Sequence, residues 1–203
     1  MALDDALMPP LPAQARAVLD FWFGAAGSPE HGTDRPEWFR KDDAFDATIR
    51  ARFGSLIERA LLGELAGWKA TPEGALAETI VLDQFTRNVH RNTPRAFAGD
   101  ARALAIAQTM VASGQDQMLA PFQRVFVYLP FEHSESRSVQ EHSVRLFEHL
   151  ATQWPPAASN VDYAERHRAI IERFGRFPHR NAILGRATTD EEIAFLKTPG
   201  SSF

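Results

Sequence analysis

Cysteine is missing from all 203 positions of the sequence. A chain without thiols cannot form a disulfide, use a thiolate nucleophile, or bind zinc or an iron–sulfur cluster through cysteine. Structural disulfides are typical of secreted proteins and rare in the cytosol, so the sequence favours a cytoplasmic location.

Long apolar runs are missing as well. No stretch reaches the roughly 18 uncharged apolar residues that a transmembrane helix requires. The N-terminal segment Met1–Asp5 carries acid where a secretory signal needs positive charge. We therefore expect no membrane association and no export signal.

Positive charge is in slight deficit. Lys and Arg number 22 against 26 for Asp and Glu, which gives a net charge of -4. Such a chain has no overall field that would attract nucleic acid or an anionic membrane, so any anion site must be local. With 44% hydrophobic and 24% charged residues, the composition is that of an ordinary globular protein. We expect one helical domain spanning residues 1–203.

The alternating pattern of β-strands is not found, and apolar residues instead recur three or four positions apart. The clearest helix begins at Asp42 or Asp43, and its apolar face consists of Phe45, Ile49, Phe53, Ile57, Leu61 and Leu65. The whole pattern predicts an all-α fold of about eight helices that pack as an irregular stack of antiparallel pairs. No regular repeat of roughly 34 residues, the tetratricopeptide length, is present.

Capping residues and helix breakers mark the predicted helix ends. Helix starts are expected at Pro12, Thr71, Asp100, Pro121, Ser134 or Ser136, Ser159 or Asn160, and Thr189. Helix ends are expected at Gly24, Gly114, Pro130, Pro155 and Gly175. Residues 130–136 are therefore predicted to form a loop.

One polar motif occurs twice. Residues 85–92 and 174–181 share the pattern Phe-x-Arg-x-x-His-Arg-Asn, and each copy lies where an apolar helix gives way to a loop. Arginine offers a rigid fork of donors, histidine a proton or a lone pair, and asparagine an orienting amide. The motif predicts a binding site for phosphate or carboxylate, built from Arg87, His90, Arg91, Asn92, Arg176, His179, Arg180 and Asn181.

A third polar tract, residues 129–136, combines two carboxylates, a histidine and two hydroxyls. Loops held by rigid helices are common places for functional sites. We expect His133, beside Glu132 or Glu135, to act as a base whose pKa is raised by the carboxylate partner, and we take His133 and Glu132 as the candidate catalytic residues. His167, in contrast, is interpreted as a solvent-edge or boundary residue of a helix.

Each tract also has a purely structural interpretation. Arginine and histidine can bond the free carbonyl groups at a helix end, asparagine can adopt the left-handed closing conformation, and serine can cap the next helix. No metal site is predicted, because the histidines lack a metal-ligand spacing and the neighbouring arginines would repel a cation. Neither a cofactor nor an oligomeric state follows from these residues.

Five segments together resemble the family catalogued as domain of unknown function 924. They read VLDFWFG at 18–24, WF at 38–39, LDQFTRNVHR at 82–91, PFEHSE at 130–135 and FPHRN at 177–181. The resemblance implies a tetratricopeptide-like stack of helices. It implies no activity, and three of the five shared segments fall on the three polar tracts.

Three hypotheses for function remain open. In the first, the three tracts converge on one cleft that binds, and could act on, a small anionic molecule. Arg87, Arg91, Arg176 and Arg180 would then hold the anion, and His133 with Glu132 would handle a proton. In the second, the chain is an interaction module that holds a peptide or a partner protein in an apolar groove. In the third, the tracts fasten helix ends together and function lies elsewhere.

Overall fold

The computed structural model describes residues 9–202, which are helical with no strand in that range, so the all-α prediction is confirmed. The α-helices are α1 Ala13–Phe23, α2 Asp43–Leu62, α3 Pro72–Ile80, α4 Thr86–Val89, α5 Asp100–Ser113, α6 Pro121–Glu132, α7 Arg137–Gln153, α8 Ala158–Phe174 and α9 Asp190–Leu196. A π-helical turn, Val81–Phe85, joins α3 to α4 without a break. Within residues 9–202, no helix has the length and apolar character needed to cross a membrane. The prediction for Met1–Asp5 concerns residues outside the described range.

Several of the predicted caps are present. The side chain of Asp42 accepts hydrogen bonds from the amides of Ala44 and Phe45, both at 2.9 Å, and starts α2. Thr71 caps α3 by accepting from the Gly74 amide at 3.1 Å. Thr189 and Glu192 form the predicted capping box of α9. These bonds satisfy amides that a helix start otherwise leaves free.

One wrong boundary changes the setting of a candidate catalytic residue. Pro130 does not end α6, because the helix continues to Glu132 and the His133 amide donates to the Leu129 carbonyl at 2.9 Å. Proline removes one helical hydrogen bond, but the complete burial of Phe131 stabilises this last turn. Glu132 is consequently a buried helical residue and does not belong to a surface loop.

Smaller corrections concern the starts of two helices. Asp100 does not cap α5, since Gly99 occupies the N-cap position and the Asp100 side chain is used elsewhere. Helix α8 begins at Ala158, ahead of the predicted Ser159 or Asn160, because the turn Pro155–Ala157 leads directly into it.

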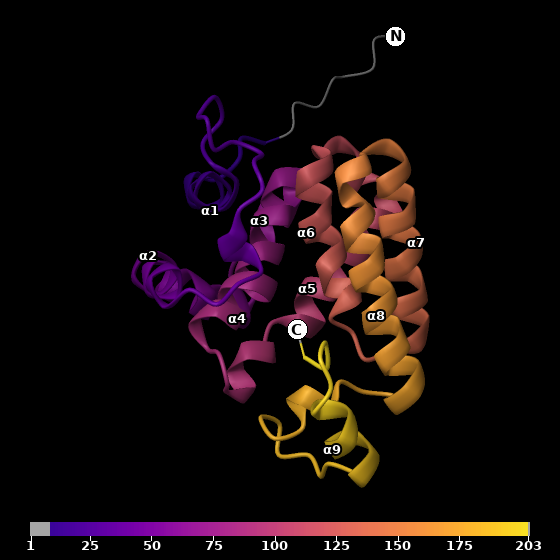
Figure 1. Ribbon diagram of the computed structural model, residues 1–203. Helices are drawn as coiled ribbons and strands as arrows, with labels where there is room; N and C mark the ends of the chain where they lie inside the picture. The colour runs from indigo at the N-terminus through magenta and orange to yellow at the C-terminus, as the bar shows by residue number, and fades with distance from the viewer. Residues whose placement is uncertain (1–8, 203) are drawn as a thin grey trace.

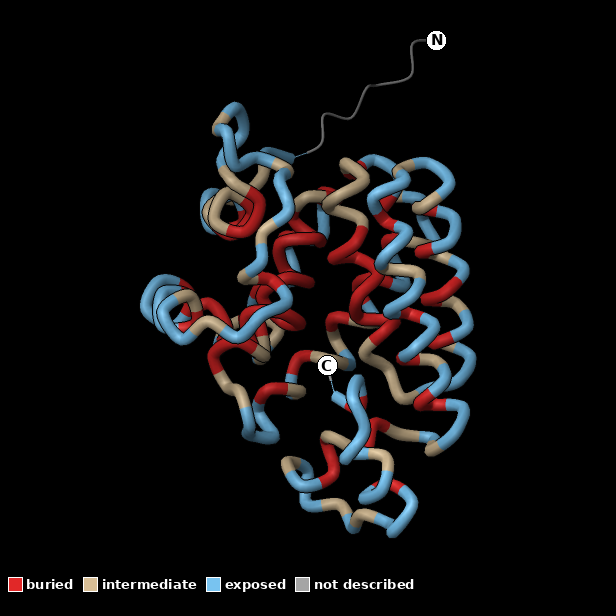
Figure 2. Tube along the Cα trace, in the orientation of Figure 1, coloured by how far each residue is buried: buried red, intermediate tan, exposed pale blue. Residues whose placement is uncertain are grey.

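Helix α3 lies at the centre of the molecule. It packs against α1, α5 and α6, and burial is concentrated along α3, α6 and the turn after α3 (Figure 2). Helices α6, α7 and α8 lie side by side on the right in Figure 1, on the side of α3 opposite to α1 and α2. Each large apolar side chain in this core stabilises the fold by about 1.5–3 kcal/mol. Polar side chains on a helix buried this deeply must find partners inside the protein.

Residues 176–202, which we call the C-terminal segment, follow α8 and form the lower part of the molecule (Figure 1). A small hydrophobic cluster, separate from the main core, holds this segment against α8, and it contains Ile170, Ile171 and Phe177 with Phe174 and Phe195 packed beside them. The second copy of the arginine motif lies at this junction.

Candidate functional site

A buried carboxylate, Asp83, lies at the centre of the candidate site. It sits in the π-helical turn, a feature often found at functional sites. Its Oδ1 atom accepts hydrogen bonds from Arg87 Nη1 at 2.9 Å and from His133 Nδ1 at 2.8 Å, and its Oδ2 atom accepts from Gln84 Nε2 at 2.7 Å. Burial alone would raise the pKa of Asp83, but the charge of Arg87 and the bond to His133 hold it well below its usual range.

Arg87 connects Asp83 to a second carboxylate. Its Nη2 atom donates to Asp100 Oδ2 at 2.9 Å, and the same Asp100 oxygen lies 3.5 Å from Arg180 Nη1. Glycine at position 99 makes this approach feasible, because a Cβ there would lie 2.1 Å from the carbonyl oxygen of Leu82. Asp83, Arg87, Asp100 and Arg180 thus form a row of alternating charge.

His133 is oriented by Asp83. The expected rise in the pKa of His133 is wrong: burial and the charge of Arg87 lower this pKa despite the bond to Asp83, so the imidazole is neutral at neutral pH. A carboxylate can only accept, so Nδ1 carries the hydrogen that is donated to Asp83, and Nε2 keeps its lone pair. An imidazole fixed in this tautomer has the form needed by a general base.

Glu132 lies next to a buried histidine. Its Oε1 atom is 3.2 Å from Nδ1 of His167, which also donates to the Tyr163 carbonyl at 2.8 Å. Burial, with repulsion from Asp83, raises the pKa of Glu132 to about 8, and burial lowers the pKa of His167 to about 3. At neutral pH both side chains are therefore uncharged, and Glu132 holds a proton. Within residues 9–202, Glu132 Oε2 has no hydrogen-bond partner.

Arg180 enters the cluster from the C-terminal segment. Its side chain is buried, and its Cζ atom lies 4.7 Å from the ring centroid of Phe97 and 4.5 Å from that of Phe177. Burial and the charge of Arg87 lower the pKa of Arg180 to about 10, so it stays charged at neutral pH. Its Nε atom is buried and has no hydrogen-bond partner among the described residues.

His179 accompanies Arg180. It is half-buried, and its ring centroid lies 5.7 Å from that of Phe177. Burial and the neighbouring Arg180 charge lower the pKa of His179 to about 4, so this imidazole is also neutral at neutral pH.

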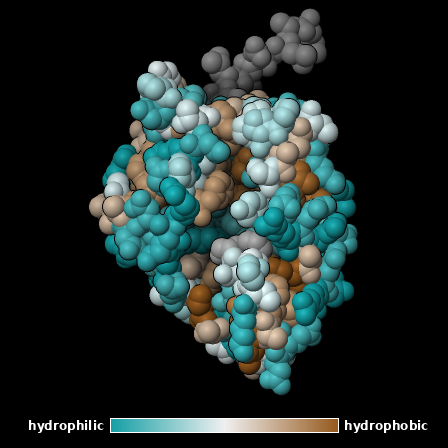
Figure 3. Space-filling model, viewed as in Figure 1, coloured by the Kyte–Doolittle hydropathy of each residue, from teal (hydrophilic) through white to brown (hydrophobic). Residues whose placement is uncertain are grey.

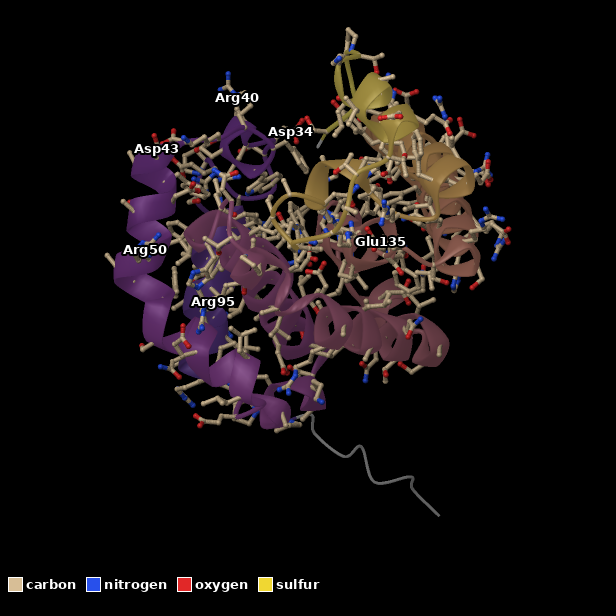
Figure 4. The ribbon with its side chains drawn as sticks, turned by 90° about the horizontal axis from the view of Figure 1, so that it is seen from below. Asp34, Arg40, Asp43, Arg50, Arg95 and Glu135 are labelled. Carbon is tan, nitrogen blue, oxygen red and sulfur yellow. The ribbon has the colours of Figure 1, made fainter. Side chains whose placement is uncertain are left out.

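Glu135 positions the C-terminal segment beside the cluster. It accepts from the Phe177 amide at 2.7 Å and from both terminal nitrogens of Arg186 at 2.7 and 3.0 Å. Figure 4 shows Glu135 next to this segment. The ion pair of Glu135 with Arg186 and the hydrogen bond from the Phe177 amide together hold the part of the chain that carries His179 and Arg180.

The remaining motif residues lie elsewhere. Arg91 donates to both oxygens of Asp46 and fastens the end of α4 to α2. His90 accepts from Arg95 Nε at 3.3 Å, and Asn92 is exposed with a left-handed backbone, φ 60°. Arg176 donates to both oxygens of Glu192, at 2.7 and 2.8 Å. These four residues have the structural roles that arginine, histidine and asparagine commonly take at helix ends.

The structure therefore brings together five of the predicted site residues, Arg87, Glu132, His133, His179 and Arg180, and places His90, Arg91, Asn92 and Arg176 outside the cluster. Asn181 is buried behind it, where its side-chain oxygen accepts from Arg186 at 3.0 Å. Within residues 9–202 no group of three potential ligands could hold a metal ion.

Sequence reasoning missed four members of the cluster: Asp83, Phe97, Asp100 and His167. Asp83 did leave a signal, because it follows the apolar residues 80–82 within a predicted helix, and an acidic residue must be paired if that helix is buried. Asp100 resembled a helix cap, and His167 was expected to be a solvent-edge or boundary residue, which is wrong because it is only 4% exposed. Nothing in the sequence around Phe97 indicated its contact with Arg180.

The cluster reaches the protein surface. The side chains of Arg87, Asp100 and His133 keep 19%, 24% and 15% of their exposure. The face in Figure 3 is hollowed near its middle, where hydrophilic residues meet less polar ones. A separate cavity of about 310 Å³ lies between α1 and the start of α3, and none of the predicted site residues lines it.

Comparisons with known proteins agree with this fold. The sequence profile of DUF924, described as a bacterial protein of unknown function, matches residues 18–200. A solved structure of a protein of unknown function from Agrobacterium tumefaciens is similar, with 39% identity, a TM-score of 0.80, and coverage of 91% of this chain and 97% of the other. No curated protein matches the chain. The chain belongs to the DUF924 family of bacterial proteins.

Proposed function

We propose that this protein binds a small anionic molecule in the cluster around Asp83, with Arg180 as the principal donor. One observation carries the proposal: the buried Nε–H of a charged guanidinium has no acceptor within residues 9–202. An unpaired buried donor is costly, and more so on a charged group. A bound anion would supply the missing acceptor.

The neighbouring groups would equip the site to move a proton. Glu132 holds a proton at neutral pH, and His133 presents a lone pair on Nε2. Titratable groups whose pKa values are shifted apart in this way are typical of acid–base sites. We therefore propose that the bound molecule exchanges a proton with His133 or Glu132. The absence of thiols from the sequence fits a cytoplasmic place for this activity.

The test is a binding screen with a matched pair of variants. Carboxylated and phosphorylated metabolites would be screened by thermal shift against the wild type, Arg180→Met and Arg176→Met. We expect some anions to raise the melting temperature of the wild type and of Arg176→Met, but not that of Arg180→Met. Equal stabilisation of all three proteins would place the anion elsewhere and contradict the proposal.

A further inference from the structure

We infer that the ligand held at Arg180 is a monocarboxylate, which the Nε and Nη2 atoms of the guanidinium bind together. This inference rests on the proposed function and adds the chemical class of the ligand. Three features carry it: the Nε edge of Arg180, the rings beside it, and the charges around it.

The edge of Arg180 that carries Nε has the shape that a carboxylate requires. Nη1 lies 3.5 Å from Asp100, whereas the buried Nε has no hydrogen-bond partner within residues 9–202. In a guanidinium, the Nε–H and Nη2–H bonds on this edge are parallel and match the two oxygens of one carboxylate. A planar acceptor with two oxygens would complete the bonding of Arg180 in one step.

Aromatic rings hold this edge in place. The guanidinium packs against Phe97 from the turn before α5 and against Phe177 from the C-terminal segment. Such contacts restrict the plane of the guanidinium, so less freedom is lost when a ligand binds. The rings also give a carboxylate with an apolar or aromatic body a surface to contact.

The charges around Arg180 favour a ligand with a single negative charge. Two guanidinium groups, Arg87 and Arg180, are already matched by the carboxylates of Asp83 and Asp100. A monoanion leaves the cluster with one excess negative charge, and a phosphate dianion leaves it with two. Water screens charges poorly in a partly buried site, so the second excess charge is strongly disfavoured beside two carboxylates.

The experiment compares two probes with the same ring, benzoate and phenyl phosphate, by isothermal titration at constant ionic strength. At about pH 7.5 the phosphate is mostly a dianion. We expect benzoate to bind the wild type about ten-fold more tightly than phenyl phosphate, because of the charge difference. We also expect Arg180→Lys to weaken benzoate binding about ten-fold, since lysine keeps the charge but has no parallel pair of donors. Arg176→Lys serves as the matched control and should bind benzoate like the wild type.

Each outcome decides the inference. If phenyl phosphate binds as tightly as benzoate and Arg180→Met abolishes both, the protein binds anions as proposed but the monocarboxylate assignment is wrong. If benzoate binds Arg180→Lys as tightly as the wild type, the two-donor edge is not used and the assignment is also wrong. If neither probe binds the wild type, the monocarboxylate assignment fails, and the anion screen decides separately whether the proposed function survives. The comparison of the two probes on the wild type holds even if a variant fails to fold.

Discussion

The two copies of the Phe-x-Arg-x-x-His-Arg-Asn motif have the same spacing, but the earlier and the later arginine have opposite roles in the two copies. In the first copy the earlier arginine, Arg87, belongs to the buried cluster, and the later one, Arg91, fastens α4 to α2. In the second copy the earlier arginine, Arg176, fastens α9, and the later one, Arg180, reaches the cluster. The motif therefore marks two contributors to the buried cluster and two structural fastenings.

Local backbone structure explains the exchange. The first copy starts inside a continuous helix, α3 to α4, and leaves it only at His90. The second copy starts at Phe174, the last residue of α8. The left-handed backbone of Gly175 ends that helix, and the copy continues through the short turn Pro178–Arg180. Identical spacing along the sequence therefore places side chains in different directions. Such a repeat identifies candidate residues without assigning their roles.

The acids beside the arginines differ in the same way. Two hydrogen bonds from Arg176 lower the pKa of Glu192 to about 2, whereas burial raises the pKa of Glu132 in the cluster to about 8. The fastening residues Arg176 and Glu192 satisfy each other's hydrogen bonds, whereas in the cluster Glu132 keeps a proton and the Nε–H of Arg180 has no acceptor among the described residues. Substitutions of the fastening residues and of the cluster residues test this division.

Replacing Arg87 should have the largest effect. Arg87→Met leaves the carboxylates of Asp83 and Asp100 buried without their shared cation, so we expect a loss of about 3–5 kcal/mol in the free energy of unfolding. Urea denaturation at neutral pH would measure it. A loss below about 1 kcal/mol would show that Arg87 does not hold the cluster together.

The pH dependence of stability should separate the two acids. A folded state that keeps the proton on Glu132 loses stability relative to the unfolded chain as pH rises from 4.5 to about 8. Glu132→Gln should remove this decline. Glu192→Gln should act in the opposite range, because the stability that Glu192 contributes is present above pH 4.5 and is lost as pH falls towards about 2. Parallel pH profiles of the two variants would contradict the division.

Replacing Arg180 should affect binding far more than folding. Methionine keeps the apolar contact with Phe97 and Phe177, and the guanidinium it replaces is incompletely paired. We expect Arg180→Met to weaken anion binding at least about ten-fold while the free energy of unfolding changes by less than about 1 kcal/mol. A large loss of stability would instead make Arg180 a fastening residue.

Arg91→Ala should have a smaller, purely structural effect. The Arg91 side chain is one-third exposed and bonds Asp46, so we expect a loss of about 1 kcal/mol in the free energy of unfolding. Anion affinity, measured by titration, should equal that of the wild type. Weaker anion binding by this variant would show that Arg91 contributes to the binding site.

The smallest effect is expected at Arg176. It donates hydrogen bonds to Glu192 in α9 and to the carbonyl of Ala187 in the loop before that helix, away from the main core. Arg176→Ala should speed amide hydrogen exchange in residues 187–196 and leave exchange in α3 and α6 unchanged. Faster exchange throughout the molecule would show that the C-terminal segment is part of the main cooperative unit.

The sequence was sufficient for the fold class and for much of the helix pattern, since the period of apolar residues and caps such as Asp42, Thr71 and Thr189 act locally. It also pointed to Arg87, Glu132, His133, His179 and Arg180. It could not separate these residues from Arg91 and Arg176, because that depends on where α2 and α9 pack. The partner acids Asp83 and Asp100 were missed for the same reason, as their roles follow from the close approach of α5 to the π-helical turn at Gly99.

The most direct test of the account is the resonance of the Arg180 Nε–H group in nitrogen–proton NMR spectra during a benzoate titration, with the Arg176 resonance as the internal reference. The Arg180 signal, assigned by its loss in Arg180→Lys, should shift in a saturable way as its unpaired hydrogen gains an acceptor, and the Arg176 signal should stay in place because Glu192 already occupies it. An unchanged Arg180 signal in benzoate, phosphate and the other anions of the screen would contradict the claim that the two motif copies build an anion site.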